Sequence, residues 1–126
     1  MSVIIICLDS NPKALRRLVQ QTKRLVPDAA VYGYQDPDEV ITRTAHEGCD
    51  VLLTDTDLGR ANTDGFILAE KIQKLNPFVN IIFLTEHADG KYGYEAYKLR
   101  ASGYLIKPYS LESLAEEFTH LRYAAI

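Results

Sequence analysis

Four polar side chains that can handle a phosphoryl group each stand at the end of a short apolar run: Asp9, Asp55, Thr85 and Lys107. An aspartate carboxylate can attack phosphorus directly and become an acyl phosphate. The attack needs a divalent cation to shield the incoming charge, and two nearby carboxylates are suitable ligands for such a cation. A threonine hydroxyl and a lysine ammonium can each contact one phosphoryl oxygen. This set of residue types therefore indicates phosphoryl transfer to a carboxylate.

The elements that would position these side chains are indicated by the apolar pattern. Runs rich in Val and Ile predict strands at 3–8, 29–34, 51–55, 80–85 and 103–106. The segments between them have helical periodicity and predict helices over 12–26, from Asp36 to Gly48, from Asp64 to before Pro77, over 90–101 and from Ser110 onward. The alternation predicts an α/β fold, a doubly wound parallel sheet with helices on both faces. Ligands bind at the carboxyl ends of such strands, so we expect the four side chains to converge there.

The size and charge of the chain limit the classes of function. Its 126 residues are the size of one domain, and we expect residues 1–126 to form a single compact unit. A net charge of −3 argues against direct nucleic-acid contact, which depends on clustered Lys and Arg. No apolar run is long enough to span a membrane and no signal peptide is recognisable, so we expect a cytoplasmic protein. Cys7 and Cys49 have no metal-ligand spacing and are expected to be buried thiols.

Five stretches of the sequence resemble one known family. They are "IIICLDSNP" at the first predicted strand, "CDVLLTDTDLG" at the third, "DGFILAEKI" in the third helix, "NIIFLTE" at the fourth strand and "ASGYLIKPYSLESL" at the fifth. On these stretches the chain resembles the receiver domains of two-component response regulators, and the resemblance covers essentially the whole chain. The resemblance implies a flavodoxin-like receiver fold, with five helices and a five-stranded parallel sheet in the order 2-1-3-4-5.

The resemblance also implies a role for each candidate residue. Asp55 would be the phosphoacceptor, and Thr85 and Lys107 would contact the phosphate. The cofactor would be Mg²⁺, held by Asp9, by Asp55 and by the backbone carbonyl of Asp57. These roles follow from the family and not from the spacing of the residues.

Partners and an output are implied in the same way. Tyr104 would be the aromatic residue whose rotamer reports phosphorylation to the face formed by the fourth helix, fifth strand and fifth helix, where a homodimer could form. The phosphodonor would be a sensor histidine kinase or a small molecule. The segment "EAYKLRASGYLIKP" resembles receivers attached to LytTR-type or winged-helix transcription factors. DNA would be contacted only through an output domain, which we expect to be absent or removed because the chain stops just after its fifth predicted helix. Apart from its own aspartyl phosphorylation and dephosphorylation, the domain would not be an enzyme.

Two positions depart from the family pattern. Ser10 follows Asp9 where the family usually has a second acidic residue, so we expect weak magnesium binding. Glu86 follows Thr85 where the family prefers a small residue, and its charge would repel an incoming phosphoryl group. We therefore expect a slow phospho-acceptor, with a degenerate receiver that acts as a phosphorylation-independent interaction module as the alternative. His87 is interpreted as a solvated loop residue, with a place on the rim of the site as the alternative.

Two other classes share parts of the pattern. "VLLTDTDLGR" resembles the nucleophile motif of haloacid-dehalogenase-like phosphatases, in which the second aspartate, here Asp57, would be the general acid and base. That motif normally ends the first strand and needs a downstream acidic pair, whereas here it ends the third strand and no acidic residue follows Lys107 until Glu112. A flavodoxin needs a phosphate-binding loop rich in Ser, Thr and Gly after its first strand, where this chain has "DSNPKAL". Both classes therefore fit less well than a receiver.

Overall fold

The computed structural model describes residues 2–60, 63–88 and 90–123. Within these residues, strands and helices alternate in the order β1 (Ile4–Leu8), α1 (Pro12–Leu25), β2 (Ala30–Tyr34), α2 (Pro37–Glu47), β3 (Val51–Asp55), α3 (Gly65–Leu75), β4 (Asn80–Thr85), α4 (Gly90–Lys98), β5 (Gly103–Ile106) and α5 (Leu111–Thr119). The strands pair in parallel in the order β2-β1-β3-β4-β5. The predicted α/β doubly wound fold and its sheet order are therefore confirmed.

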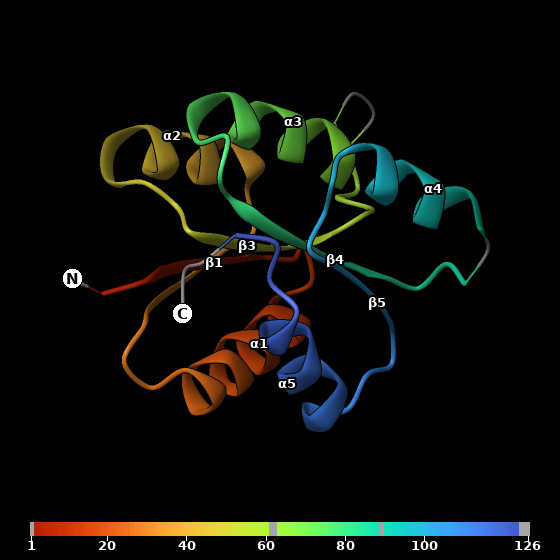
Figure 1. Ribbon diagram of the computed structural model, residues 1–126, viewed down its shortest axis with the longest axis horizontal. Coiled ribbons are helices and arrows are strands. Elements are labelled where there is room, and N and C mark those ends of the chain that lie inside the picture. The colour runs from red at the N-terminus through yellow and green to blue at the C-terminus, as the bar shows by residue number, and fades with distance from the viewer. Residues whose placement is uncertain (1, 61–62, 89, 124–126) are drawn as a thin grey trace.

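Helices cover both faces of the sheet. Figure 1 shows α1 and α5 on one face, and α2, α3 and α4 on the other. One apolar cluster includes Leu18 of α1 and Leu114 of α5, and a second includes Val40 of α2, Ile72 of α3 and Ala96 of α4. The central strands β1, β3 and β4 are almost entirely buried, so their sequences are continuously apolar instead of alternating. Because both faces are covered, these strands are held side by side, and their carboxyl ends lie at one edge of the sheet.

The helix ends follow the capping signals of the sequence in most places. Asp36 and Asp64 cap α2 and α3 by accepting hydrogen bonds from backbone N–H groups, as predicted. Gly48 ends α2 with a φ of 85°, in the left-handed region that glycine adopts without a steric penalty. The predicted bounds of these helices agree with the structure to within about two residues, the usual uncertainty of a helix end.

The end of α4 differs from the prediction of a helix over 90–101. The structure ends α4 at Lys98. Arg100 has a φ of 58°, and the N–H groups of Arg100 and Ala101 donate to the carbonyls of Tyr97 and Ala96 at 3.0 and 3.1 Å. This pair of bonds is the Schellman motif, which ends a helix through one left-handed residue that is usually glycine. Because Arg100 stands at that position, the apolar pattern contained no signal for the stop.

Two further predictions concern membranes and thiols. Among the described residues, no helix is both long and apolar enough to cross a bilayer. Cys7 and Cys49 are buried free thiols, as predicted, and burial raises the pKa of each to about 12. Both thiols are therefore protonated at neutral pH and pack as small apolar groups.

Helix α5 carries a partly buried carboxylate against β5. A Cβ atom built on Gly103 would lie 2.2 Å from Oε2 of Glu117, so glycine leaves the room that this carboxylate uses. Burial raises the pKa of Glu117 above its ordinary value of 4.5, while His120 opposes the shift and Glu116 adds to it. Because the folded chain holds this proton more tightly than the unfolded chain, ionising Glu117 disfavours folding once the pH exceeds the folded-state pKa.

Glu117→Gln is expected to stabilise the protein at pH 7 by roughly 0.5 kcal/mol, because the amide carries no charge to bury. The gain should disappear below pH 4.5, the ordinary pKa, where Glu117 itself is protonated in both states. Urea unfolding at both pH values measures the effect. Glu70→Gln is the control, because Glu70 is an exposed glutamate of α3 that does not act on Glu117, and it should show no such gain. A gain in Glu117→Gln that does not change with pH would contradict this account.

Candidate functional site

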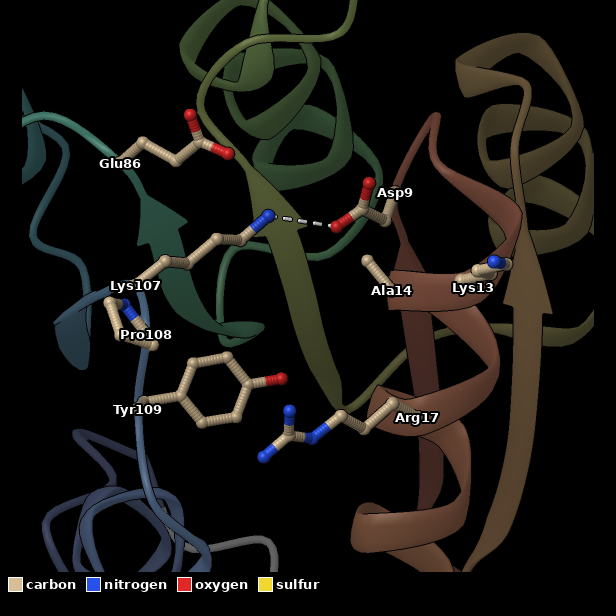
Figure 2. A pocket seen from close by; sticks show the side chains of 8 residues that line it. All are labelled: Asp9, Lys13, Ala14, Arg17, Glu86, Lys107, Pro108 and Tyr109. Atoms are coloured by element: carbon tan, nitrogen blue, oxygen red, sulfur yellow. Dashed lines mark hydrogen bonds and ion pairs between the residues drawn. The ribbon is translucent and has the colours of Figure 1, made fainter.

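An ammonium group held between two carboxylates forms the centre of the site. Lys107 Nζ lies 2.9 Å from Asp9 Oδ2 and 2.5 Å from Asp55 Oδ2. Lys107 directly follows β5, Asp9 directly follows β1 and Asp55 ends β3. Their side chains are 17%, 4% and 13% exposed. Figure 2 shows Lys107 reaching across the pocket to Asp9. The structure therefore brings three of the four predicted residues into direct contact.

The charges of the two aspartates keep Lys107 protonated. Partial burial by itself would lower the pKa of the ammonium group. The hydrogen bonds and charges of Asp55 and Asp9 outweigh burial and raise the pKa above its ordinary value of 10.5. The Lys107 ammonium group in turn allows the carboxylates of Asp9 and Asp55 to lie close together in a partly buried site.

Backbone N–H groups hold the other oxygen atoms of the aspartates. Asp9 Oδ1 accepts from the N–H of Asn11 at 2.9 Å, and Asp55 Oδ1 accepts from the N–H of Asp57 at 2.9 Å. The side chain of Asp57 is exposed and accepts from the N–H of Gly59 at 3.0 Å. Its carboxylate is thus engaged in a local turn, which leaves the backbone carbonyl as the group that Asp57 could offer to a metal.

The first turn of α3 lies directly against Asp55. A Cβ atom built on Gly65 would lie 2.2 Å from the backbone oxygen of Asp55, which is far inside contact distance. The N–H of Gly65 also donates to the carbonyl of Thr56 at 3.0 Å. Only glycine permits this approach, and the packing fixes the backbone that carries the Asp55 carboxylate.

The fourth predicted residue, Thr85, has its hydroxyl engaged elsewhere. Thr85 is fully buried, and its Oγ1 accepts from the hydroxyl of Thr56 at 2.8 Å and from the N–H of His87 at 3.1 Å. It is not among the described residues that line the cavity beside Asp55. Its partner Thr56 is not among the residues predicted from the sequence. The signal for it is the sheet register: Asp55 is paired with Leu84, which puts Thr56 level with Thr85.

Residue His87 connects Thr85 with Tyr104. Its N–H donates to Thr85, and its carbonyl accepts from the Tyr104 hydroxyl at 3.1 Å. The exposed His87 side chain lines the cavity and packs on the ring of Tyr92, with ring centroids 4.8 Å apart. His87 is thus an exposed loop residue, as predicted, and it also lies on the rim of the site, which was the alternative.

A cavity of about 290 Å³ opens beside the ammonium group. Among the described residues, the charged side chains that line it are four carboxylates and one ammonium: Asp9, Asp55, Asp57, Glu86 and Lys107. Four negative charges and one positive charge leave a surplus of three negative charges. Such a cavity attracts cations and repels anions unless a cation neutralises part of its charge.

The donor set suits a magnesium ion that keeps most of its water. Among the described residues, no three His, Cys, Asp or Glu side chains are grouped closely enough to hold a metal. Asp9 and Asp55 supply two carboxylates, and Mg²⁺ commonly binds through one or two carboxylates together with several waters. Ser10 lines the cavity but adds no charge, and its carbonyl accepts from Gln35 Nε2 at 3.1 Å. The residues therefore fit Mg²⁺, with few direct ligands.

The sheet order and the position of the site define the class of the protein. A 2-1-3-4-5 sheet with polar residues at the ends of β1 and β3, where the strand order reverses, is typical of flavodoxin-like α/β domains. The family model for the response regulator receiver domain matches residues 5–119, and the chain belongs to this family. Receiver domains are regulatory modules of response regulators and not classical enzymes.

Curated relatives are longer than this chain. The chain is 29% identical over 104 residues to the transcriptional regulatory protein NatR of Bacillus subtilis (strain 168), a match that covers 82% of this chain and 43% of NatR. It is 30% identical over 79 residues to the DNA-binding transcriptional regulator NtrC of Salmonella typhimurium, covering 63% of this chain and 16% of NtrC. The chain thus spans less than half the length of these relatives.

Solved structures share the fold. The isolated REC domain of RcsB from Salmonella enterica serovar Typhimurium superposes with a TM-score of 0.82 at 20% identity, covering 94% of this chain and 87% of that one. The signal receiver domain of an HD domain-containing protein from Pseudomonas fluorescens Pf-5 has a TM-score of 0.82 at 23% identity, covering 94% and 93%. These similarities confirm the receiver fold.

Gly65→Ala is expected to lower the free energy of unfolding by roughly 1–3 kcal/mol, because the new Cβ must displace the backbone of Asp55. Gly93→Ala in α4 is the matched control, since no atom of the described residues outside its chain neighbours and its own helix backbone lies within 4 Å of a Cβ built there. Alanine at an open helical position should instead stabilise by roughly 0.5–1 kcal/mol. Urea unfolding followed by circular dichroism measures both variants. Equal effects at the two glycines would contradict the close packing at Asp55.

Proposed function

We propose that this protein is a phospho-accepting receiver domain in which Asp55 takes a phosphoryl group from a histidine kinase or a small phosphodonor. The observation that supports this most directly is the contact of Lys107 Nζ with the Asp9 and Asp55 carboxylates at the carboxyl edge of the sheet. A carboxylate can attack an anionic donor only where positive charge is available, and Lys107 supplies it beside Asp55.

In the proposed step, an oxygen atom of the Asp55 carboxylate forms a bond to phosphorus while the bond from phosphorus to the leaving group breaks. The leaving group is an imidazole nitrogen when phosphohistidine is the donor, and acetate when acetyl phosphate is the donor. Lys107 then pairs its charge with one phosphoryl oxygen, and the hydroxyl of Thr85 donates to another. Hydrolysis of the acyl phosphate returns the Asp55 carboxylate and releases inorganic phosphate.

The proposed function includes Mg²⁺ as a cofactor, because the cavity carries a net negative charge that would repel an anionic phosphodonor. Asp9, Asp55 and the backbone carbonyl of Asp57 are the groups that would hold Mg²⁺, which shields the negative charge of the donor when it is bound. The surplus of three negative charges around the cavity favours a divalent cation. Binding is weak in this proposal because Ser10 contributes no carboxylate.

The proposed partners are a sensor histidine kinase and, through the α4-β5-α5 face, a second copy of the chain. That face exposes Tyr94, Tyr97 and Ile106 by 61%, 79% and 42%, which suits an interface. NatR and NtrC are named as transcriptional regulators. By analogy, residues 1–126 would form one domain that acts in the cytoplasm and affects DNA only through an output domain, of the LytTR or winged-helix kind. Switching this face by phosphorylation of Asp55 would control that output.

A degenerate receiver, acting as a phosphorylation-independent interaction module, is the second candidate. The observation that favours it is Glu86, an exposed carboxylate that lines the cavity. Figure 2 shows the Glu86 side chain pointing into the same pocket as the Lys107 ammonium. A negative charge at this point opposes the approach of a phosphoryl donor. Because Ser10 supplies no carboxylate to hold Mg²⁺, the cation that could offset this charge would be bound only weakly.

Incubation with Mg²⁺ and acetyl phosphate, followed by intact-mass measurement, tests the proposal. We expect one phosphoryl adduct that is labile to hydroxylamine, because an acyl phosphate is a mixed anhydride with a reactive carbonyl carbon. The adduct should be absent in Asp55→Asn, whose amide is not a nucleophile. Asp57→Asn is the matched control, since it changes the neighbouring aspartate in the same way and should keep the adduct.

Three outcomes would point elsewhere. No adduct at high donor concentration would favour the degenerate receiver. An adduct that survives in Asp55→Asn but is lost in Asp57→Asn would show that Asp57, and not Asp55, is the phosphoacceptor. Turnover of small phosphate esters would favour a haloacid-dehalogenase-like phosphatase, with Asp57 as its general acid and base.

Ser10→Asp is expected to tighten Mg²⁺ binding about tenfold, because affinity rises with the number of anionic ligands. A Mg²⁺ titration followed by NMR chemical shifts, starting from protein treated with EDTA, measures the dissociation constant. Ser2→Asp makes the same charge change at an exposed position outside the lining of the cavity and serves as the control. The same affinity in Ser10→Asp and Ser2→Asp would show that the missing carboxylate does not limit metal binding.

A further inference from the structure

The hydroxyl groups of Thr56 and Thr85 form a buried pair beside the phosphoacceptor. The hydroxyl of Thr56 donates to Oγ1 of Thr85 at 2.8 Å, and the two residues are 3% and 0% exposed. The N–H of His87 also donates to Oγ1 of Thr85, at 3.1 Å. A hydroxyl oxygen has two acceptor positions, and both are used here. Both acceptor positions of Thr85 Oγ1 are therefore occupied by groups outside the cluster of Asp9, Asp55 and Lys107.

The backbone at both ends of this pair is fixed. The N–H of Thr56 donates to the carbonyl of Leu84 at 3.0 Å, and the carbonyl of Thr56 accepts from Gly65 at 3.0 Å. On the other side, the carbonyl of Thr85 accepts from the N–H of Lys107 at 2.7 Å. Neither backbone can move toward the other or away without breaking these bonds. Rotation about χ1 of Thr85 is the simplest motion that redirects its hydroxyl.

That rotation has a cost in hydrogen bonds. Thr85 is fully buried and is not among the described residues lining the cavity next to Asp55, so its hydroxyl must leave both donors to reach a phosphoryl group. The rotation leaves the hydroxyl of Thr56 and the N–H of His87 without this acceptor in a buried setting, where an unpaired donor is unfavourable. Of these two donors, only the hydroxyl of Thr56 depends on the residue at position 56. The N–H of His87 is a backbone group and is present whatever residue stands there.

We infer that Thr56 is a positioning residue, which holds the hydroxyl of Thr85 away from the phosphoacceptor and so opposes the phosphorylated state. The inference rests on the proposed function, because it assigns Thr56 an effect on the contact between Thr85 and the phosphoryl group on Asp55. Thr56 acts through Thr85 and touches no reacting atom. It makes the domain harder to switch by the free energy of one buried hydrogen bond.

The test compares Thr56→Val, which removes the hydroxyl at nearly constant volume, with Thr56→Ser, which keeps it. Titration with beryllofluoride in the presence of Mg²⁺, followed by ¹⁹F NMR, measures affinity for a phosphoryl mimic. Thr56→Val should bind it about two- to tenfold more tightly, the fold-change that corresponds to one net hydrogen bond. Thr56→Ser should restore the wild-type affinity. Thr44→Val, which removes a buried hydroxyl bonded to the Val40 carbonyl in α2, controls for loss of a buried hydrogen bond far from the site.

A second measurement needs no phosphoryl mimic. Three-bond couplings to the methyl group of Thr85 report its χ1 rotamer, which should be single in the wild-type chain and averaged in Thr56→Val. Unchanged couplings in Thr56→Val would overturn the inference, as would equal or weaker beryllofluoride binding by that variant. If the wild-type chain binds no beryllofluoride at all, the proposed function fails together with the inference. Binding by the wild-type chain with no gain in Thr56→Val overturns the inference alone.

Discussion

The contact of the Lys107 ammonium with the carboxylates of Asp9 and Asp55 is the interaction on which the rest of the site depends. Two carboxylates in a partly buried site repel each other, and removal of the ammonium would leave their charges uncompensated. Asp9 and Lys107 are 98 residues apart in the chain, so only the fold brings them together. Burial of β1, β3 and β4 on both faces holds the carboxyl ends of these strands at one edge of the sheet. The N–H of Lys107 donates to the carbonyl of Thr85 at 2.7 Å, which continues the pairing of β4 with β5 as far as Lys107.

The same contact limits how a divalent cation could bind. Each of the four carboxylate oxygens already accepts one hydrogen bond: Oδ2 of Asp9 and of Asp55 from Lys107, and Oδ1 of each from the N–H of Asn11 or Asp57. A carboxylate oxygen has a second lone pair, so a cation can share these atoms but cannot have them alone. In the proposed function, weak binding of Mg²⁺ therefore has two causes, the missing charge at Ser10 and the presence of the Lys107 ammonium.

Much of the fold was predictable from the sequence because it depends on patterns that repeat along the chain. Buried strands are continuous apolar runs, and Asp36 and Asp64 carry capping side chains that mark helix starts. The end of α4 was not predictable, because Arg100 adopts a left-handed conformation that a residue of its type rarely shows. The meeting of Asp9 and Lys107 followed from topology alone. The partner of Thr85 did not, because it depends on the register between β3 and β4 and on a side-chain rotamer, which no local pattern encodes.

The connection from the site to the α4-β5-α5 face runs through the backbone of His87. Its N–H binds Thr85 and its carbonyl binds Tyr104, so the two residues expected to respond to phosphorylation hold opposite ends of one loop residue. If Thr85 turns toward a phosphoryl group, the N–H of His87 loses its acceptor, and the loop that holds the Tyr104 hydroxyl is no longer fixed from that side. The imidazole ring instead packs on Tyr92 of α4. Coupling along this route therefore needs a peptide unit at position 87 and not a histidine, while the ring adds a separate contact between the loop and the helix that forms part of the face.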